Sequence, residues 1–190
     1  MNSSQKNTLL LLFESPKTVF TMAGIALLTG ESREGVLSKR LNYYVREGKL
    51  QNPRRGIYAK KGYNPEELAC LLYTPSYLSL EYVLQKAGVV FQYDSCLTCA
   101  GYLSRTVEAD GKEYRYRKVK GEILADTSGI DNKGLINIAT PERAFLDTMY
   151  LNAEYYFDNL RPLDYRKIMA LLPIYGNKRM EARVKKMFDK

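Results

Sequence analysis

The residues best suited to chemistry in this sequence are its cysteines, two of which, Cys96 and Cys99, are separated by two residues. That spacing is typical of zinc-binding and redox-active pairs. A second pair is missing, Cys70 is the only other thiol, and the chain contains no histidine. Without histidine it lacks both the usual general base and every imidazole ligand. We therefore expect reduced, partly buried thiols, with no bound metal and no other cofactor.

Acidic and glycine-rich motifs give little more support for catalysis. Glu113 lies close in sequence to Arg117 and Lys118, a combination that a nuclease could use, but no second acid stands at a suitable spacing. The sequence has no glycine-rich phosphate loop followed by lysine and serine or threonine. We predict no catalytic residues, and a protein that is not an enzyme.

The basic residues are concentrated at one end of the chain. The protein has 190 residues and a net charge of +8. Up to Gly62 there are 11 basic and 4 acidic residues, a net charge of +7, whereas the remainder has 18 basic and 17 acidic residues. A basic module joined to a near-neutral one is typical of nucleic-acid binding, although a solvated basic surface without a partner also fits.

The first elements predicted in this basic part are two short helices. Residues 8–14 are apolar enough for a helix, and residues 18–20 have the composition of a short extended segment. A second helix over 22–28 is expected to begin after Thr21 as its N-cap and to end at Gly30.

A third helix is predicted from a cap at Ser32 to about Glu47, with Gly48 as its stop. At 3.6 residues per turn, one face is apolar, with Leu37, Leu41, Tyr44 and Val45. The opposite face has Gly35, Lys39, Asn42 and Arg46, flanked by Ser38 and Tyr43. These polar types suit the edges of bases in the DNA major groove. An amphipathic helix that only faces solvent is the alternative.

The segments 49–52 and 57–60 are predicted to form a hairpin around Pro53-Arg54-Arg55-Gly56. An ordinary hairpin with solvated arginines is one interpretation. The order of the elements instead indicates a winged helix-turn-helix: two helices are followed by a capped amphipathic helix and a basic hairpin. In such a domain the third helix enters the major groove, while the hairpin contacts the backbone or the minor groove. The predicted DNA-binding residues are Arg33, Ser38, Lys39, Asn42, Tyr43, Arg46, Arg54, Arg55 and Lys60.

The change in charge predicts a domain boundary after Gly62, with a winged helix-turn-helix domain over 1–62 and a mixed α+β domain over 63–190. Thr140-Pro141-Glu142 is a strong helix start, and Asp110-Gly111 is a strong hairpin turn. A helix is also expected after a cap at Ser79. Extended segments are expected at 89–93, 97–103, 112–119 and 135–138. Further helices are expected at 142–151, 165–172 and 178–186, and residues 66–73 are expected to be a helix or a buried strand.

Aromatic and basic residues alternate in the predicted strand at 112–119. Tyr114 and Tyr116 share one face of it, and Arg115 and Arg117 share the other. A half-buried edge strand with solvated arginines explains this pattern, and an auxiliary contact to DNA or a partner is the alternative.

Several segments together resemble the AbiEi-family antitoxins of bacterial type IV toxin-antitoxin systems. They are Val19–Met22, Val45–Leu50, Arg55–Tyr58, Tyr77–Ser79 and, above all, Ala139–Asp147. The resemblance covers most of the chain, except for the part after Leu160.

This resemblance implies a repressor of its own operon that binds inverted repeats upstream of a gene for a nucleotidyltransferase-like toxin. The C-terminal domain would oppose the toxin without forming a stable complex with it, and the repeats would allow copies of the chain to associate on DNA. The longest apolar run near the start is too short to span a membrane, so a cytoplasmic protein is expected. Two alternatives stay open: a stand-alone regulator with an apolar ligand pocket, and a nuclease that uses the winged helix only to dock on DNA.

Overall fold

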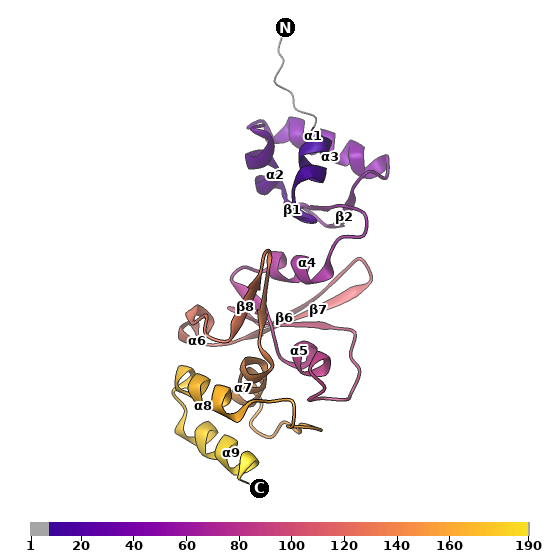
Figure 1. The fold of residues 1–190 in the computed structure, drawn as a ribbon. Coiled ribbons are helices and arrows are strands. Elements are labelled where there is room, and N and C mark those ends of the chain that lie inside the picture. The colour runs from indigo at the N-terminus through magenta and orange to yellow at the C-terminus, as the bar shows by residue number, and fades with distance from the viewer. Residues whose placement is uncertain (1–7, 190) are drawn as a thin grey trace. The chain divides into compact units, whose positions relative to one another are not determined.

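The structure is a computed structural model that describes residues 8–189, and it is of mixed α+β type (Figure 1). The chain forms two compact units, an N-terminal unit up to Leu68 and a C-terminal unit from Ala69. The division falls inside helix α4 (Pro65–Leu72). The division between the units therefore lies later in the chain than the change of charge after Gly62. The start of α4 belongs to the N-terminal unit because the carboxylate of Glu67 accepts hydrogen bonds from the backbone N–H groups of Thr18 and Val19.

From Thr8 onward, the N-terminal unit contains three helices before α4 and one antiparallel sheet with the strand order β1-β3-β2. Its elements are α1 (Thr8–Glu14), β1 (Val19–Thr21), α2 (Met22–Thr29), α3 (Glu34–Arg46), β2 (Gln51–Arg54) and β3 (Ile57–Ala59).

Local capping explains where the helix α2 begins and ends. The side chain of Thr21 accepts a hydrogen bond from the N–H of Gly24 at 3.0 Å, and Gly30 takes the left-handed conformation with φ 69°. The predicted cap at Ser32 is wrong, because Arg33 occupies the N-cap position of α3 and makes no side-chain capping bond. The guanidinium of Arg33 binds Glu31 instead.

The core of the N-terminal unit is built by all three of these helices and the sheet. Its buried residues are Leu12, Phe20, Ile25, Leu37, Leu41, Leu50 and Tyr58. Tyr44 and Val45 are partly buried against this cluster. The predicted apolar face of the third helix is therefore confirmed.

The C-terminal unit contains one mixed sheet of six strands in the order β6-β7-β5-β4-β9-β8. The strands are β4 (Ser76–Leu78), β5 (Leu97–Gly101), β6 (Arg105–Ala109), β7 (Lys112–Lys118), β8 (Ile130–Lys133) and β9 (Ile136–Ala139). The pairs β4–β9 and β5–β7 are parallel, and the other neighbouring strands are antiparallel.

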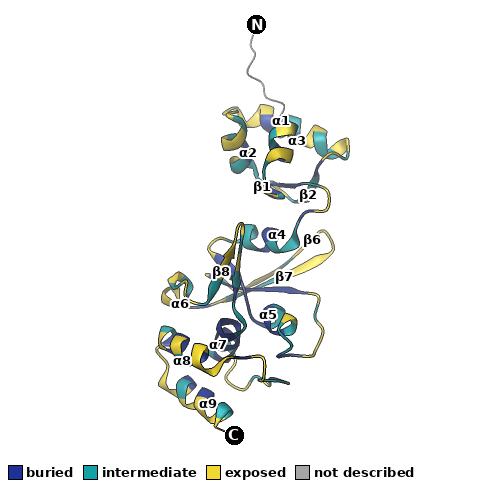
Figure 2. Cartoon of the chain, viewed as in Figure 1, coloured by how far each residue is buried: buried dark blue, intermediate teal, exposed yellow. Residues whose placement is uncertain are grey.

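The helices of this unit are α5 (Glu81–Lys86), α6 (Gly121–Ala125), α7 (Pro141–Leu151), α8 (Tyr165–Leu171), the 3-10 helix η1 (Leu172–Tyr175) and α9 (Lys178–Phe188). Thr140 caps α7 by accepting a hydrogen bond from the N–H of Arg143, as the helix start predicted. Helix α7 packs against α5, α8 and β9. Its residues 142–149 are all buried, and Figure 2 shows the helix dark along its length.

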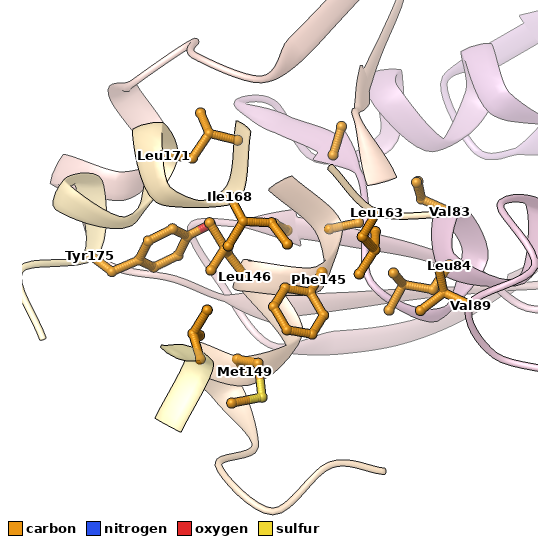
Figure 3. Packing of buried hydrophobic residues seen from close by; sticks show 14 of the residues in the cluster. Val83, Leu84, Val89, Phe145, Leu146, Met149, Leu163, Ile168, Leu171 and Tyr175 are labelled. Carbon is orange, nitrogen blue, oxygen red and sulfur yellow. The ribbon is translucent and has the colours of Figure 1, made fainter. Parts of the chain in front are cut away.

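Apolar side chains from α5, α7, α8 and η1 meet in the core of the C-terminal unit. Figure 3 shows Phe145, Leu146 and Met149 of α7 in one cluster with Ile168 of α8 and Leu84 of α5. Helix α7 is thus buried on most of its surface, and the core of the C-terminal unit is built around it.

Three predictions for this unit are wrong. Ser79 does not cap α5, since its hydroxyl donates to Asp147 and Leu80 occupies the N-cap position. Residues 89–93 are not a strand, because Val89 and Val90 fill the core while the following residues form a surface loop. Strand β7 is not at an edge, since β6 lies outside it; the alternation itself is confirmed by the complete burial of Tyr114 and Tyr116.

Within residues 8–189, no helix is both long and apolar enough to cross a membrane. None of the three cysteines, all of which lie within the described residues, forms a disulfide; Cys96 and Cys99 are buried and Cys70 is partly accessible.

Candidate nucleic-acid interface

The outward face of α3 carries the polar residues that the helical spacing placed together. Lys39, Asn42 and Arg46 are all exposed, whereas Leu37 and Leu41 on the opposite face are fully buried. The buried leucines fix the rotation of the helix about its own axis, so the polar face points to solvent. The side chain of Arg46 is 75% exposed and lies 4.0 Å from the carboxylate of Glu47 at the end of the helix.

An aromatic ring organises the positive charge at the C-terminal end of α3. The ring of Tyr43 is 44% exposed, and its centroid lies 5.4 Å from the guanidinium of Arg46 and 5.9 Å from the ammonium group of Lys49. Such cation–π contacts hold the two charges on one side of the ring. Lys49 was not among the predicted site residues, because it follows the helix and was assigned to a strand. Its spacing of three residues from Arg46 was the available signal.

A hydrogen bond joins the outward face of α3 to the sheet. The hydroxyl of Tyr58 in β3 donates to Oδ1 of Asn42 at 3.4 Å. Burial raises the pKa of Tyr58, which keeps this donor neutral. Asn42 is thus fixed through its side-chain oxygen while the residue remains exposed.

The hairpin of β2 and β3 is shorter at its tip than the sequence predicted. Arg54 is paired with Ile57 at the end of β2 and is partly buried, so the tip consists of Arg55 and Gly56. Gly56 has φ 79°, a conformation that favours glycine. The side-chain amide of Asn52 donates to the carbonyls of Arg54 and Ile57 at 2.9 and 2.6 Å, which holds the turn together. Of the two arginines, Arg55 is exposed and Arg54 is partly buried.

The remaining predicted residues have more varied surroundings. Arg33 is exposed and binds Glu31 through Nε at 3.0 Å, a contact that raises the pKa of Arg33 and lowers that of Glu31. Ser38 is partly buried beside the outward face of α3. The ammonium group of Lys60 donates to the carbonyl of Ser15 at 2.6 Å, so it fastens the chain after α1.

A second polar cluster, in the C-terminal unit, is entirely buried. It centres on Asp147 of α7, whose carboxylate accepts hydrogen bonds from the hydroxyls of Tyr77 at 3.0 Å, Ser79 at 2.7 Å and Tyr175 at 2.7 Å. Nε of Arg143, one helical turn earlier, lies 3.5 Å from Oδ1 of Asp147 as an ionic contact without hydrogen-bond geometry. The segments 77–79 and 139–147, which carry much of the family resemblance, thus meet in one place.

The ionisation of this cluster is governed by its burial. Burial raises the pKa of Asp147, and the charge of Arg143 and the three hydroxyl donors oppose that effect. The guanidinium of Arg143 also donates to the carbonyls of Ile123 and Ser128 at 2.7 and 2.9 Å. With solvent excluded on every side, this arrangement fixes α7 against β4, α6 and η1 and offers no surface for a substrate.

The part of the chain that the structure describes contains no group of three or more cysteine, aspartate or glutamate side chains placed to hold a metal ion. Comparison of the chain with protein-family models and with curated proteins found no match to either.

Proposed function

We propose that the protein binds double-stranded DNA through its N-terminal unit, acting as a winged helix-turn-helix, and that it represses transcription. The observation that carries this proposal is the outward face of α3, where Lys39, Asn42 and Arg46 are exposed without an acidic residue among them. The neighbouring hairpin carries Arg55 at its tip. A helix of this composition suits the major groove, and a basic hairpin beside it suits the adjacent backbone.

The roles of these residues follow from their types. Asn42 presents an amide that can pair with adenine, and Arg46 carries a guanidinium that can bind guanine in two places at once. Lys39 and Lys49 add charge for phosphates. Arg55 contacts backbone phosphate or enters the minor groove, and Arg54 supports it from the end of β2. These contacts divide the interface into base readout by α3 and backbone positioning by the hairpin.

The biological role follows from the family resemblance. In this proposal the chain represses its own operon by binding inverted repeats, and it is the antitoxin to a nucleotidyltransferase-like toxin encoded beside it. The toxin is opposed without a stable complex, and the chain is not itself an enzyme. The convergence of Tyr77, Ser79 and Asp147 in one buried cluster supports this, since it gives the most distinctive shared segments a common structural purpose in the C-terminal unit.

Substitutions that separate readout from positioning test the interface. Asn42→Ala and Arg46→Ala are expected to lower affinity for the operator by about 10-fold each and to reduce discrimination against unrelated DNA. Arg54→Ala/Arg55→Ala is expected to weaken binding to both DNAs and to reduce the slope of log K against log salt by up to about 2. Lys133→Ala, an exposed lysine of β8, is the control. Equal loss on operator and unrelated DNA for every variant would refute base readout by α3.

The antitoxin role has a separate test in cells. Co-expression of the chain with the neighbouring nucleotidyltransferase-like gene is expected to restore growth that the toxin alone arrests. Asn42→Ala/Arg46→Ala should lose repression and keep this rescue, because the two activities belong to different units. A failure of the wild-type chain to rescue growth would remove the antitoxin role and leave a stand-alone regulator.

The alternative of a stand-alone, ligand-sensing regulator predicts an apolar pocket in the C-terminal unit. A hollow of about 580 Å³ does lie in that unit. Its lining is of tyrosine, glutamine, lysine, aspartate and serine side chains rather than of aliphatic ones. This composition favours a charged or aromatic partner over an apolar metabolite.

A further inference from the structure

The hollow in the C-terminal unit is formed by helix α5, the loop between α5 and β5, and the turn between β6 and β7. Its lining residues are Tyr82, Gln85, Lys86, Tyr93, Asp94, Ser95, Gly111 and Lys112. None of these belongs to the proposed DNA interface of α3 and the hairpin. The hollow therefore has to be explained by another partner.

The aromatic groups of the hollow are presented in two different ways. Tyr93 is 87% exposed, so its ring is available to a flat partner. The ring of Tyr82 is covered by the ammonium group of Lys86, which lies 4.4 Å from the ring centroid. This cation–π contact fixes the ammonium group of Lys86 beside the ring of Tyr82.

The electrostatic balance of the hollow is positive. Its one carboxylate, Asp94, lies 3.4 Å from Nη1 of Arg115, whose Nη2 also binds the carboxylate of Glu113 at 2.6 Å, so this group of three side chains keeps one net negative charge. Lys86 of α5 and Lys112 at the start of β7 are both exposed, and their two positive charges outweigh that negative charge. An anionic partner is the one that this balance attracts.

The loop that carries Tyr93 is fastened on both sides. The N–H of Phe91 donates to Oδ2 of Asp158 at 2.8 Å, and the N–H of Cys96 donates to Oδ1 of Asp94 at 2.9 Å. The side chain of Gln85 also donates to the carbonyl of Gln92. Because the loop is already ordered, little conformational entropy is lost when a partner binds to Tyr93.

We propose that this hollow binds single-stranded nucleic acid, with a base stacked on Tyr93 and the flanking phosphates held by Lys86 and Lys112. An exposed ring in a hollow that also contains cations is the arrangement by which proteins bind single strands without reading sequence, since every base has a face to stack and every nucleotide a phosphate. The open form of the hollow fits a continuous strand. This site is independent of the proposed operator contacts and provides the C-terminal unit with an activity of its own.

The test is the binding of a fluorescently labelled oligothymidylate to the full chain, followed by anisotropy. Tyr93→Ala is expected to weaken binding by about 10-fold, the loss typical of one stacked base. Lys86→Ala/Lys112→Ala is expected to reduce the slope of log K against log salt by about 1.4, since each phosphate contact on a single strand contributes about 0.7. The matched controls are Tyr156→Ala, whose ring is 78% exposed outside the hollow, and Lys120→Ala/Lys133→Ala.

Further arms separate this site from the operator interface and from other anionic partners. Arg54→Ala/Arg55→Ala should retain binding of the single strand, and Tyr93→Ala should retain binding of duplex operator. The proposal is overturned if Tyr93→Ala binds oligothymidylate like the wild type, or if only the hairpin variant loses that binding. It is also overturned if polyglutamate or free thymidine monophosphate binds as tightly as the oligonucleotide.

Discussion

Replacement of Asp147 by alanine should strongly destabilise the C-terminal unit. The carboxylate accepts hydrogen bonds from three buried hydroxyls and lies beside the buried guanidinium of Arg143. Both side chains of this ion pair are 0% exposed. Removing one partner of a buried pair costs about 3–5 kcal/mol, because the other charge stays buried without compensation. The loss of hydrogen-bond acceptors for the hydroxyls places the expected effect at the upper end of that range.

Urea unfolding followed by circular dichroism measures the loss of free energy, and hydrogen exchange of the α7 amides locates it in the C-terminal unit. The chain supplies a matched control in Glu181→Gln. Glu181 and Lys185 also form an ion pair one helical turn apart, at 2.7 Å, but both side chains are about half exposed. This substitution should leave stability unchanged within error, because solvent screens an exposed pair.

A double variant separates the charge from the packing. Arg143→Met/Asp147→Leu removes both charges together and should be more stable than Asp147→Ala, since no uncompensated charge is left in the core. If Asp147→Ala unfolds at the same urea concentration as the wild type, the cluster does not hold the C-terminal unit together. The reasoning would be equally refuted if the double variant were the less stable of the two.

Three further predictions concern other parts of the fold. Glu67→Ala should destabilise the N-terminal unit by about 1.5–3 kcal/mol in urea unfolding, because the backbone N–H groups that bind its carboxylate lose a charged acceptor. An unchanged unfolding midpoint would contradict this prediction. Gly129→Ala should cost about 1–3 kcal/mol more stability than Gly134→Ala in thermal unfolding. Both glycines have φ 71°, but a Cβ at Gly129 would lie 3.0–3.2 Å from Leu171 and Arg143, whereas a Cβ at Gly134 would meet open space. Equal losses of stability would refute the close packing at Gly129. Burial raises the pKa of Cys96 to about 12 from 9.0, so iodoacetamide at neutral pH should modify Cys70 and spare Cys96 in the folded protein, as peptide mass spectrometry would show. Because the pKa of Cys96 is raised in the folded state, the stability that the neutral thiol contributes is complete below pH 9 and is lost as the pH rises toward 12. The Cys96→Ala variant should therefore lose less stability than the wild type over that pH interval.

The parts of the fold that depend on local signals could be predicted from the sequence. Thr21 and Gly30 bound α2, Thr140 begins α7, and Asp110-Gly111 forms the hairpin turn, because each acts through contacts within a few residues. The two faces of α3 were predicted for the same reason, since helical spacing alone decides which residues share a face.

The parts that depend on distant partners could not be predicted. Strand β4 is three residues long and exists because β5 and β9 pair with its two edges. Ser79 looked like a helix cap, but its hydroxyl is used by Asp147, 68 residues later. In the candidate interface, Lys60 is held by the carbonyl of Ser15, a contact that sequence spacing does not reveal.

The sequence predicted Arg54 in the tip of the hairpin rather than at the end of β2, and it did not predict Lys49 as a site residue, for a related reason. Both lie near the ends of β2, and the register of the hairpin decides which side chains reach its tip. The structure pairs Arg54 with Ile57 and leaves Arg55 in the turn. A shift of a strand by one residue moves every side chain to the opposite face of the sheet. Composition alone therefore does not determine which residues form the turn of the hairpin.

The central claim is tested most directly by titrating the purified chain against DNA from immediately upstream of its own gene and against unrelated DNA of equal length, at two salt concentrations. A repressor that reads its operator through α3 should bind the upstream DNA more tightly by at least about 10³-fold at physiological salt, and the preference should fall by about 100-fold in Asn42→Ala/Arg46→Ala. Equal, salt-sensitive binding of both DNAs would contradict it and reduce the N-terminal unit to a basic docking module.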